Sequence, residues 1–208
     1  MEIEYKGAHC LTIKLPQATV VIDPKLSLVG LKDVTITDMI EVVTDEQFIV
    51  KANEKILIES PGEYEVANVS IKGVAAKRHR DESGKKVTMY QISSAGTRAG
   101  VVGHISDDLS EDQLEQLGLI DILIVPVGGS GYTLDAHAAA KLVGRISPKV
   151  VIPVHYADKD IKYEVAQNEL DLFLKEVGAT QHETLDKFKL KTGAALPEIL
   201  TVVELNRT

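Results

Sequence analysis

The apolar residues of this chain follow one pattern before about residue 100 and another after it, and this change constrains the fold most. In the first half, short runs of alternating or β-branched residues are separated by Gly, Pro, Asn and Asp, which is typical of antiparallel strands. In the second half, helical patterns alternate with short, fully apolar runs, which is typical of helices packed on a sheet. The expected strands of the first half are residues 3–5, 10–15, 19–22, 47–50, 55–58, 63–66, 69–74 and 88–92.

The second half is expected to form three helices and two buried strands. Ser110 can cap the first helix, Gln113 can complete a capping box and Gly118 can end it. The two strands should be neighbours in one sheet, with the first two helices on its outer face. The expected helices are residues 111–117, 134–146 and 163–177, the expected strands are residues 121–126 and 150–154, and residues 80–86 are expected to form a charged turn.

Composition limits the classes of protein to which the chain can belong. Its 208 residues are enough for one α/β domain over 1–208, and 44% hydrophobic with 26% charged residues is the balance of a soluble globular protein. No run approaches the roughly 20 apolar residues of a membrane span, and the first residues lack a signal-peptide pattern, so we expect a cytoplasmic protein. The single cysteine, Cys10, excludes an internal disulfide. A net charge of −8 disfavours nucleic acid as a partner.

Three longer strings are more specific than the periodicity. They are SPGEYEVANVSIKGVAA (60–76), GHISDDLSEDQLEQLGLIDILIVPVGG (103–129) and TLDAHAAAKLVGRISPKVVIPVHY (133–156), and VVIDP (20–24) accompanies them. Together they resemble the metallo-β-lactamase superfamily, in particular the branch of Zn-dependent hydrolases that includes proteins similar to ascorbate-6-phosphate lactonase. The resemblance implies a four-layer αββα sandwich, with metals held by loops at one edge of its two sheets.

Family members bind two metals through a His-x-His-x-Asp-His loop, followed by an isolated His, a bridging Asp and a final His. The resemblance implies that His79, Asp107 and His155 occupy the last three positions. The first motif is missing, because the corresponding stretch, 33–48, contains no histidine. The Gly-His pair near the N-terminus of the family is also altered, since His9 is displaced by one position.

If the missing motif starts at Thr37, then Asp38, Ile40 and Val43 stand at its histidine positions and Val42 at its aspartate position. Its apolar residues are then expected to pack into the space that a metal would need. Each surviving candidate also has a purely structural interpretation: His155 as a hydrogen-bonded histidine at a strand end, Asp107 as a turn carboxylate and His79 as an exposed histidine. The other candidates, His104, His137 and His182, are expected to be structural or to lie on the surface.

The sequence therefore favours a degenerate member that has lost two-metal hydrolysis and binds a small molecule or a protein partner without a cofactor. The alternative is a residual hydrolase of a small phosphorylated or lactone substrate, with one zinc or manganese ion on His79, Asp107 and His155. A nucleic-acid binder is the weakest hypothesis, because the chain has no Trp and three Phe for stacking. Assembly into a homo-oligomer stays open.

Overall fold

The computed structural model describes residues 1–52, 54–79 and 85–208, which form two β-sheets and three α-helices. The first sheet has six strands in the order β13-β1-β2-β3-β4-β5. Its strands are β1 (Glu2–Gly7), β2 (Cys10–Lys14), β3 (Thr19–Ile22), β4 (Ile40–Val42), β5 (Ile56–Ile58) and β13 (Phe188–Lys189). Strand β2 is antiparallel to both of its neighbours, β1 and β3, whereas β3, β4 and β5 are parallel.

The second sheet has eight strands in the order β12-β14-β11-β10-β9-β8-β7-β6. Its strands are β6 (Gly62–Val66), β7 (Val69–Lys77), β8 (Lys86–Ser94), β9 (Thr97–Val101), β10 (Ile122–Pro126), β11 (Val150–Val154), β12 (Gln181–Leu185) and β14 (Thr201–Leu205). The pairs from β6 to β9 are antiparallel and those from β9 to β12 are parallel. The expected neighbours β10 and β11 do pair.

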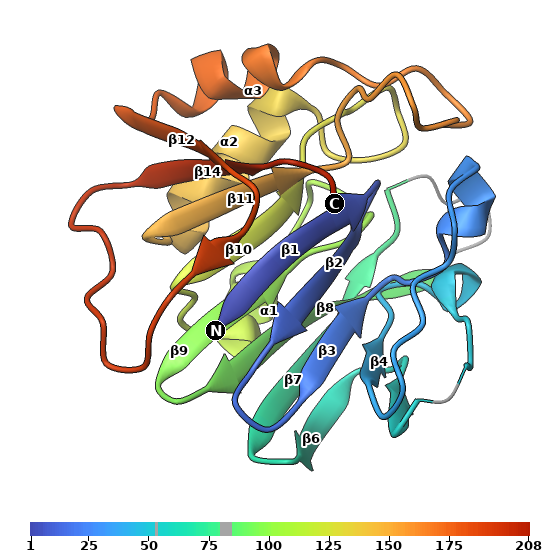
Figure 1. Cartoon of the computed structure of the whole chain (residues 1–208). Coiled ribbons are helices and arrows are strands. Elements are labelled where there is room, and N and C mark those ends of the chain that lie inside the picture. The colour runs from blue at the N-terminus through green and yellow to red at the C-terminus, as the bar shows by residue number, and fades with distance from the viewer. Residues whose placement is uncertain (53, 80–84) are drawn as a thin grey trace.

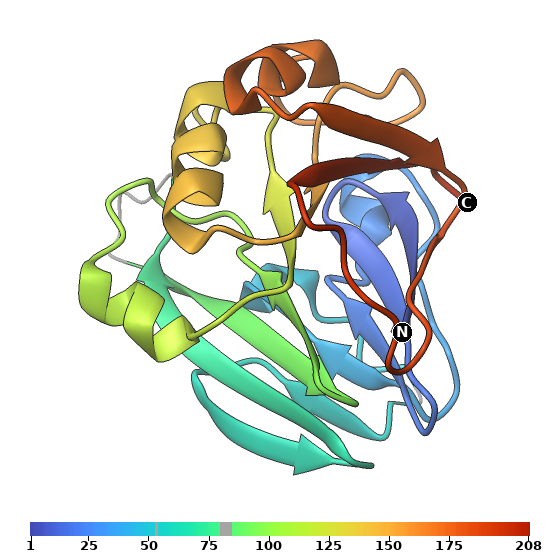
Figure 2. The same ribbon diagram turned by 90° about the vertical axis from the view of Figure 1, so that its left-hand side faces the viewer.

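The helices cover the outer face of the eight-stranded sheet, and the six-stranded sheet packs on its other face (Figures 1 and 2). They are α1 (Glu111–Leu117), α2 (Ala136–Ile146) and α3 (Leu170–Val177). The capping box expected at α1 is present. The Ser110 side chain accepts from the Gln113 backbone N–H, and the Gln113 side chain accepts from the Ser110 backbone N–H. At α2, Asp135 accepts from the backbone of Ala138.

The main core lies between the two sheets. Leu11, Ile13, Val20 and Ile22 of the first sheet and Ile92, Ile122 and Ile152 of the second are among its fully buried residues. Burying one such side chain contributes roughly 1.5–3 kcal/mol. The opposite side of the first sheet, at Cys10 and Val21, is covered by residues 24–39, which include the 3₁₀-helix η1 (Leu26–Val29).

Two expected elements differ in the structure. The strand expected at 47–50 is replaced by the 3₁₀-helix η2 (Glu46–Phe48), which Asp45 caps by accepting from the Gln47 backbone N–H. The helix expected from residue 163 begins only at Leu170, because the preceding segment is held by tertiary hydrogen bonds such as that from the Asn168 N–H to the Gly128 carbonyl. The expected charged turn falls largely on residues 80–84, outside the described residues; the strands on both sides of it, β7 and β8, pair antiparallel.

Several chain segments meet at one edge of the sheets. Strands β1, β3 and β4 run in the same direction, and so do β9, β10 and β11. The residues that follow the carboxyl ends of these strands therefore gather in the same region, which is where ligand sites form in parallel sheets. No helix in the described part of the chain has the length and apolar character that a membrane crossing requires.

Candidate functional site

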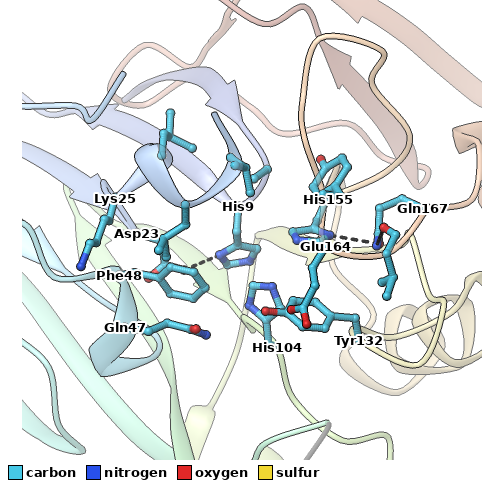
Figure 3. A pocket seen from close by; sticks show the side chains of 16 residues that line it. His9, Asp23, Lys25, Gln47, Phe48, His104, Tyr132, His155, Glu164 and Gln167 are labelled. Atoms are coloured by element: carbon cyan, nitrogen blue, oxygen red, sulfur yellow. Dashed lines mark hydrogen bonds and ion pairs between the residues drawn. The ribbon is translucent and has the colours of Figure 1, made fainter. Parts of the chain in front are cut away.

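A pocket of about 180 Å³ lies where these strand ends meet. Its walls combine imidazole rings with aromatic side chains and one buried carboxylate (Figure 3). The side chains that matter most below are those of His9, Asp23, Phe48, His104, Tyr132 and His155. They come from the segments that follow six different strands, three in each sheet, so the pocket depends on the packing of both sheets.

One wall of the pocket is a buried pair formed by His9 and Asp23. Nδ1 of His9 lies 2.6 Å from Oδ2 of Asp23, and both side chains are almost completely buried. Thr44 donates its backbone N–H to Oδ1 of Asp23 and its hydroxyl to Oδ2, each at 2.7 Å. The carboxylate is therefore fully engaged, while Nε2 of His9 has no hydrogen-bond partner among the described residues.

Local backbone conformations place this pair. His9 and Ala8 form the tight turn between β1 and β2, in which Ala8 has a φ of 48°, and Asp23, directly after β3, has a φ of 45°. Positive φ is uncommon for residues other than glycine and is often found near functional sites. The turn directs the His9 side chain toward the pocket (Figure 3).

His104 lies between the other rings of the pocket. Its ring centroid is 5.6 Å from that of His9, 5.4 Å from that of Tyr132 and 4.8 Å from that of His155. It is 3% exposed, and neither ring nitrogen has a partner among the described residues. Burial, followed by the neighbouring His155 and His9, lowers the pKa of His104 well below its usual value, so the ring is uncharged at neutral pH.

His155 completes the group of imidazoles. Its Nδ1 lies 3.2 Å from Oε1 of Gln167, and its backbone N–H donates to the carbonyl of Ala8 at 2.8 Å. Burial, together with the nearby His9, lowers the pKa of His155 to about 3. The rings of His9, His104 and His155 point toward the same space (Figure 3). A buried polar atom that stays unsatisfied costs about 1–3 kcal/mol, so the nitrogens of His9 and His104 that lack partners among the described residues favour a bound polar molecule.

The structure separates the three candidate metal residues. His155 lines the pocket. His79 is half-buried beside the pocket, where its backbone N–H donates to the His104 carbonyl at 2.8 Å. The Nδ1 atom of His79 has no hydrogen-bond partner among the described residues. Asp107 is exposed and lines a different hollow, together with Leu134 and other residues near α2. The pocket thus brings His155 together with His104 and His9, and Asp107 lies outside it. Metal binding by the three candidates stays a prediction.

Several apolar residues of the segment that stands in place of the missing motif are buried, but none of those expected to fill the metal space lines the pocket. Met39, Ile40, Val42 and Val43 are fully buried. Because Ile40 and Val42 belong to β4, a register that begins at residue 37 would put the motif inside a core strand. The residues of this segment that line the pocket are Gln47 and Phe48, which belong to η2. Neither is a metal ligand of the expected kind.

Comparisons with known proteins identify the family. Residues 2–155 match the family described as the beta-lactamase superfamily domain. The chain belongs to this family. It is 30% identical over 83 residues to a UPF0173 protein of Pyrococcus furiosus and 36% identical over 56 residues to a UPF0173 metal-dependent hydrolase of Nanoarchaeum equitans. These matches cover 36% and 26% of this chain, and 39% and 26% of the two relatives.

Solved structures of this superfamily share the fold. A Thermotoga maritima protein, described as a Zn-dependent hydrolase of the metallo-β-lactamase superfamily, superposes with a TM-score of 0.77 and 26% identity, over 99% of this chain and 98% of that one. A metallo hydrolase of Ignicoccus hospitalis superposes with a TM-score of 0.61 and 16% identity, over 85% of this chain and 90% of that one. The metallo-β-lactamase fold expected from the sequence is confirmed.

The donor groups of this superfamily member do not fit the two-metal centre that the family implies. Such a centre needs free carboxylates as well as imidazoles. Asp23 is engaged by His9 and Thr44, and Asp45 pairs with Arg78, whose Nε lies 2.9 Å from Oδ2. Within residues 1–52, 54–79 and 85–208, no three His, Cys, Asp or Glu side chains are placed to bind one ion.

The sequence reasoning missed the central residue of the pocket. His104 was expected to be structural or on the surface, whereas it is the ring that His9 and His155 approach. A usable signal existed, because Gly103 and His104 follow closely on the end of β9, as Asp23 follows β3 and His155 follows β11. Polar residues at the carboxyl ends of neighbouring parallel strands tend to share one site.

Proposed function

We propose that this β-lactamase superfamily member binds a small molecule in the imidazole-lined pocket and does not operate by two-metal hydrolysis. One observation carries the proposal: the pocket contains buried imidazole nitrogens without partners among the described residues, at His9 and His104, while the buried carboxylate beside them, Asp23, is already satisfied. Such an arrangement is suited to a ligand that supplies hydrogen bonds. The other carboxylate that lines the pocket, Glu164, is exposed, and among the described residues no three His, Cys, Asp or Glu side chains are placed to bind one ion.

The chemistry of the walls indicates the kind of ligand. His104 and His155 are uncharged at neutral pH, because burial lowers their pKa values. An uncharged molecule with hydroxyl, ester or amide groups can hydrogen-bond to them, while Phe48 and Tyr132 provide aromatic contacts. The net charge of −8 disfavours binding to the phosphates of nucleic acid, so we expect the ligand to be a small molecule of the cytoplasm.

The metal content of the protein tests the first part of this proposal. The chain is purified without chelators and without a metal-affinity tag, and zinc, manganese and iron are measured by mass spectrometry. We expect less than stoichiometric metal, with a melting temperature unchanged by EDTA and by added zinc. A saturable metal-dependent rise in melting temperature that His155→Ala abolishes would contradict the proposal.

Ligand binding tests the second part. Protein labelled at its histidine side chains is titrated with a library of small uncharged alcohols, amides and esters, and the imidazole resonances are followed by NMR. Compounds that bind in the pocket should shift His9, His104 and His155 but leave the exposed His137 unchanged. His104→Phe keeps an aromatic ring of similar width and removes both nitrogens, so it should abolish this binding. If no compound shifts the three pocket histidines, the binding role is wrong.

A residual metal-dependent hydrolase is the second candidate, and the names of the relatives favour it. The matched proteins of N. equitans and T. maritima are described as metal-dependent and Zn-dependent hydrolases. On this alternative a single zinc or manganese ion would use His155 and act on a small phosphorylated or lactone substrate. The metal measurement above separates the two candidates, because only this one requires stoichiometric metal for activity.

A further inference from the structure

The buried pair of His9 and Asp23 has a defined proton arrangement. Asp23 receives the backbone N–H and the hydroxyl of Thr44, and its Oδ2 also faces Nδ1 of His9 at 2.6 Å. A carboxylate in this position acts as an acceptor, so the ring proton of a neutral His9 is assigned to Nδ1. Nε2 is then left with a free lone pair.

This lone pair is available to a molecule in the pocket. His9 is 2% exposed, and its Nε2 is buried without a partner among the described residues. The ring lines the pocket, pointing toward the space that it shares with His104 and His155 (Figure 3). An imidazole whose Nδ1 is held by a carboxylate and whose Nε2 faces a bound molecule has the geometry of a general base.

His104 supplies the complementary group. Its ring centroid is 5.6 Å from that of His9, and the residue is 3% exposed. A neutral imidazole carries one N–H, and with no partner among the described residues this N–H can donate to an oxygen on which negative charge develops. The pocket therefore places a proton acceptor, Nε2 of His9, close to a hydrogen-bond donor, the ring N–H of His104.

We propose that His9, oriented by Asp23, is the general base of a metal-independent hydrolysis of small uncharged esters in this pocket. Nε2 of His9 takes a proton from a bound water as the water oxygen bonds to the ester carbonyl carbon. The carbonyl electron pair moves to its oxygen, which accepts from His104. When the bond to the leaving oxygen breaks, the proton on Nε2 passes to that oxygen, so ester and water become acid and alcohol.

This inference rests on the proposed binding role of the pocket, and it assigns different roles to the two residues. His9 is a catalytic residue because it contacts the reacting water. Asp23 is a positioning residue, because it acts only by keeping the proton on Nδ1 of His9. Carbonyl esters suit this site, since water activated by one imidazole can attack a carbonyl carbon without a metal ion.

The experiment follows hydrolysis of p-nitrophenyl acetate in buffer containing EDTA. His9→Gln should lower kcat/KM by roughly 100-fold, and Asp23→Asn by at least roughly tenfold. The matched control is His137→Gln, because His137 also pairs with a carboxylate, Glu176 at 3.1 Å, but is 81% exposed on the surface. It should leave the rate unchanged. A rate that His9→Gln leaves at the wild-type level, or that EDTA abolishes, overturns the proposal.

A second measurement needs no substitution and therefore does not depend on the folding of variants. Long-range ¹⁵N–¹H NMR of the wild-type protein should show the His9 proton on Nδ1, and Asp23→Asn, where it folds, should move that proton to Nε2. A His9 ring protonated only on Nε2 in the wild-type protein would overturn the proposal. If small uncharged compounds still bind the pocket while esters are not hydrolysed, the general-base role fails and the binding role stands. If neither occurs, both fail.

Discussion

Thr44 makes two hydrogen bonds to Asp23, one from its backbone N–H and one from its hydroxyl, each 2.7 Å long. Removing the hydroxyl would leave a buried carboxylate with one donor fewer. We therefore expect Thr44→Val to lower the free energy of unfolding by about 1.5–3 kcal/mol, the usual contribution of a hydrogen bond to a charged group. Urea denaturation measures this loss. Thr44→Ser keeps the hydroxyl and should retain most of the stability, so equal losses in both variants would contradict the explanation.

His104 should limit the stability of the ligand-free protein. Both of its ring nitrogens are buried without partners among the described residues, and such groups cost about 1–3 kcal/mol when they are left unsatisfied. His104→Phe is expected to raise the free energy of unfolding by about 1 kcal/mol while pocket binding is lost. Exposed His137→Phe serves as the control and should change stability by less than about 0.5 kcal/mol. A marked destabilisation by His104→Phe would show that the nitrogens are already well satisfied.

Gly103 is required because the backbone comes close to Thr44. A Cβ atom at Gly103 would lie 2.7 Å from Cβ and 2.8 Å from Oγ1 of Thr44, and its φ is +53°. Gly103→Ala should therefore cost about 2 kcal/mol or more and disturb the Asp23 hydrogen bonds. Gly96 has a φ of +82° with nothing within 4 Å, so Gly96→Ala isolates the cost of the backbone conformation. Equal melting temperatures for the two variants would rule out the steric explanation.

Stability at acid pH should depend on Glu4. Hydrogen bonds from Lys14 and then Lys6 lower the pKa of Glu4 from 4.5 to about 2. Because the folded-state pKa is depressed, the stabilisation is fully present above pH 4.5 and is lost as the pH falls through about 2. Glu4→Gln should cost about 1 kcal/mol at pH 7 and little at pH 2. Denaturation at both pH values checks this, with the exposed Glu63→Gln as the control; a difference that persists at pH 2 would contradict it.

Much of the fold follows from local sequence signals. The two buried strands and the capping box at Ser110 were predicted from periodicity and turn residues. The outer position of the first two helices was predicted from the alternation of strands and helices together with the family resemblance. The short β4 was missed, because its three residues sit inside a longer apolar segment with no turn signal of their own. The later start of α3 could not be predicted either, since contacts such as that between His155 and Gln167 hold the preceding segment outside a helix.

The candidate site was less predictable. The family resemblance identifies residues only by their position in a motif. It indicated His155, which lines the pocket, and also Asp107, which lies outside it. The partnership between His9 and Asp23 joins residues that are separated by 14 positions, one directly before β2 and the other directly after β3. Only the register between β2 and β3 brings these two strands into place, and register depends on the packing of the whole sheet.

The hydrogen bond from the His155 backbone N–H to the Ala8 carbonyl joins the first turn of one sheet to a strand end of the other. Residues 8 and 155 are far apart in the chain, so the pocket exists only after both sheets have docked. A nascent chain or a fragment that ends before β11 therefore lacks the complete binding site. A ligand that contacts both His9 and His155 will stabilise the packing of the two sheets against each other. Binding to this pocket would therefore report that the protein has finished folding.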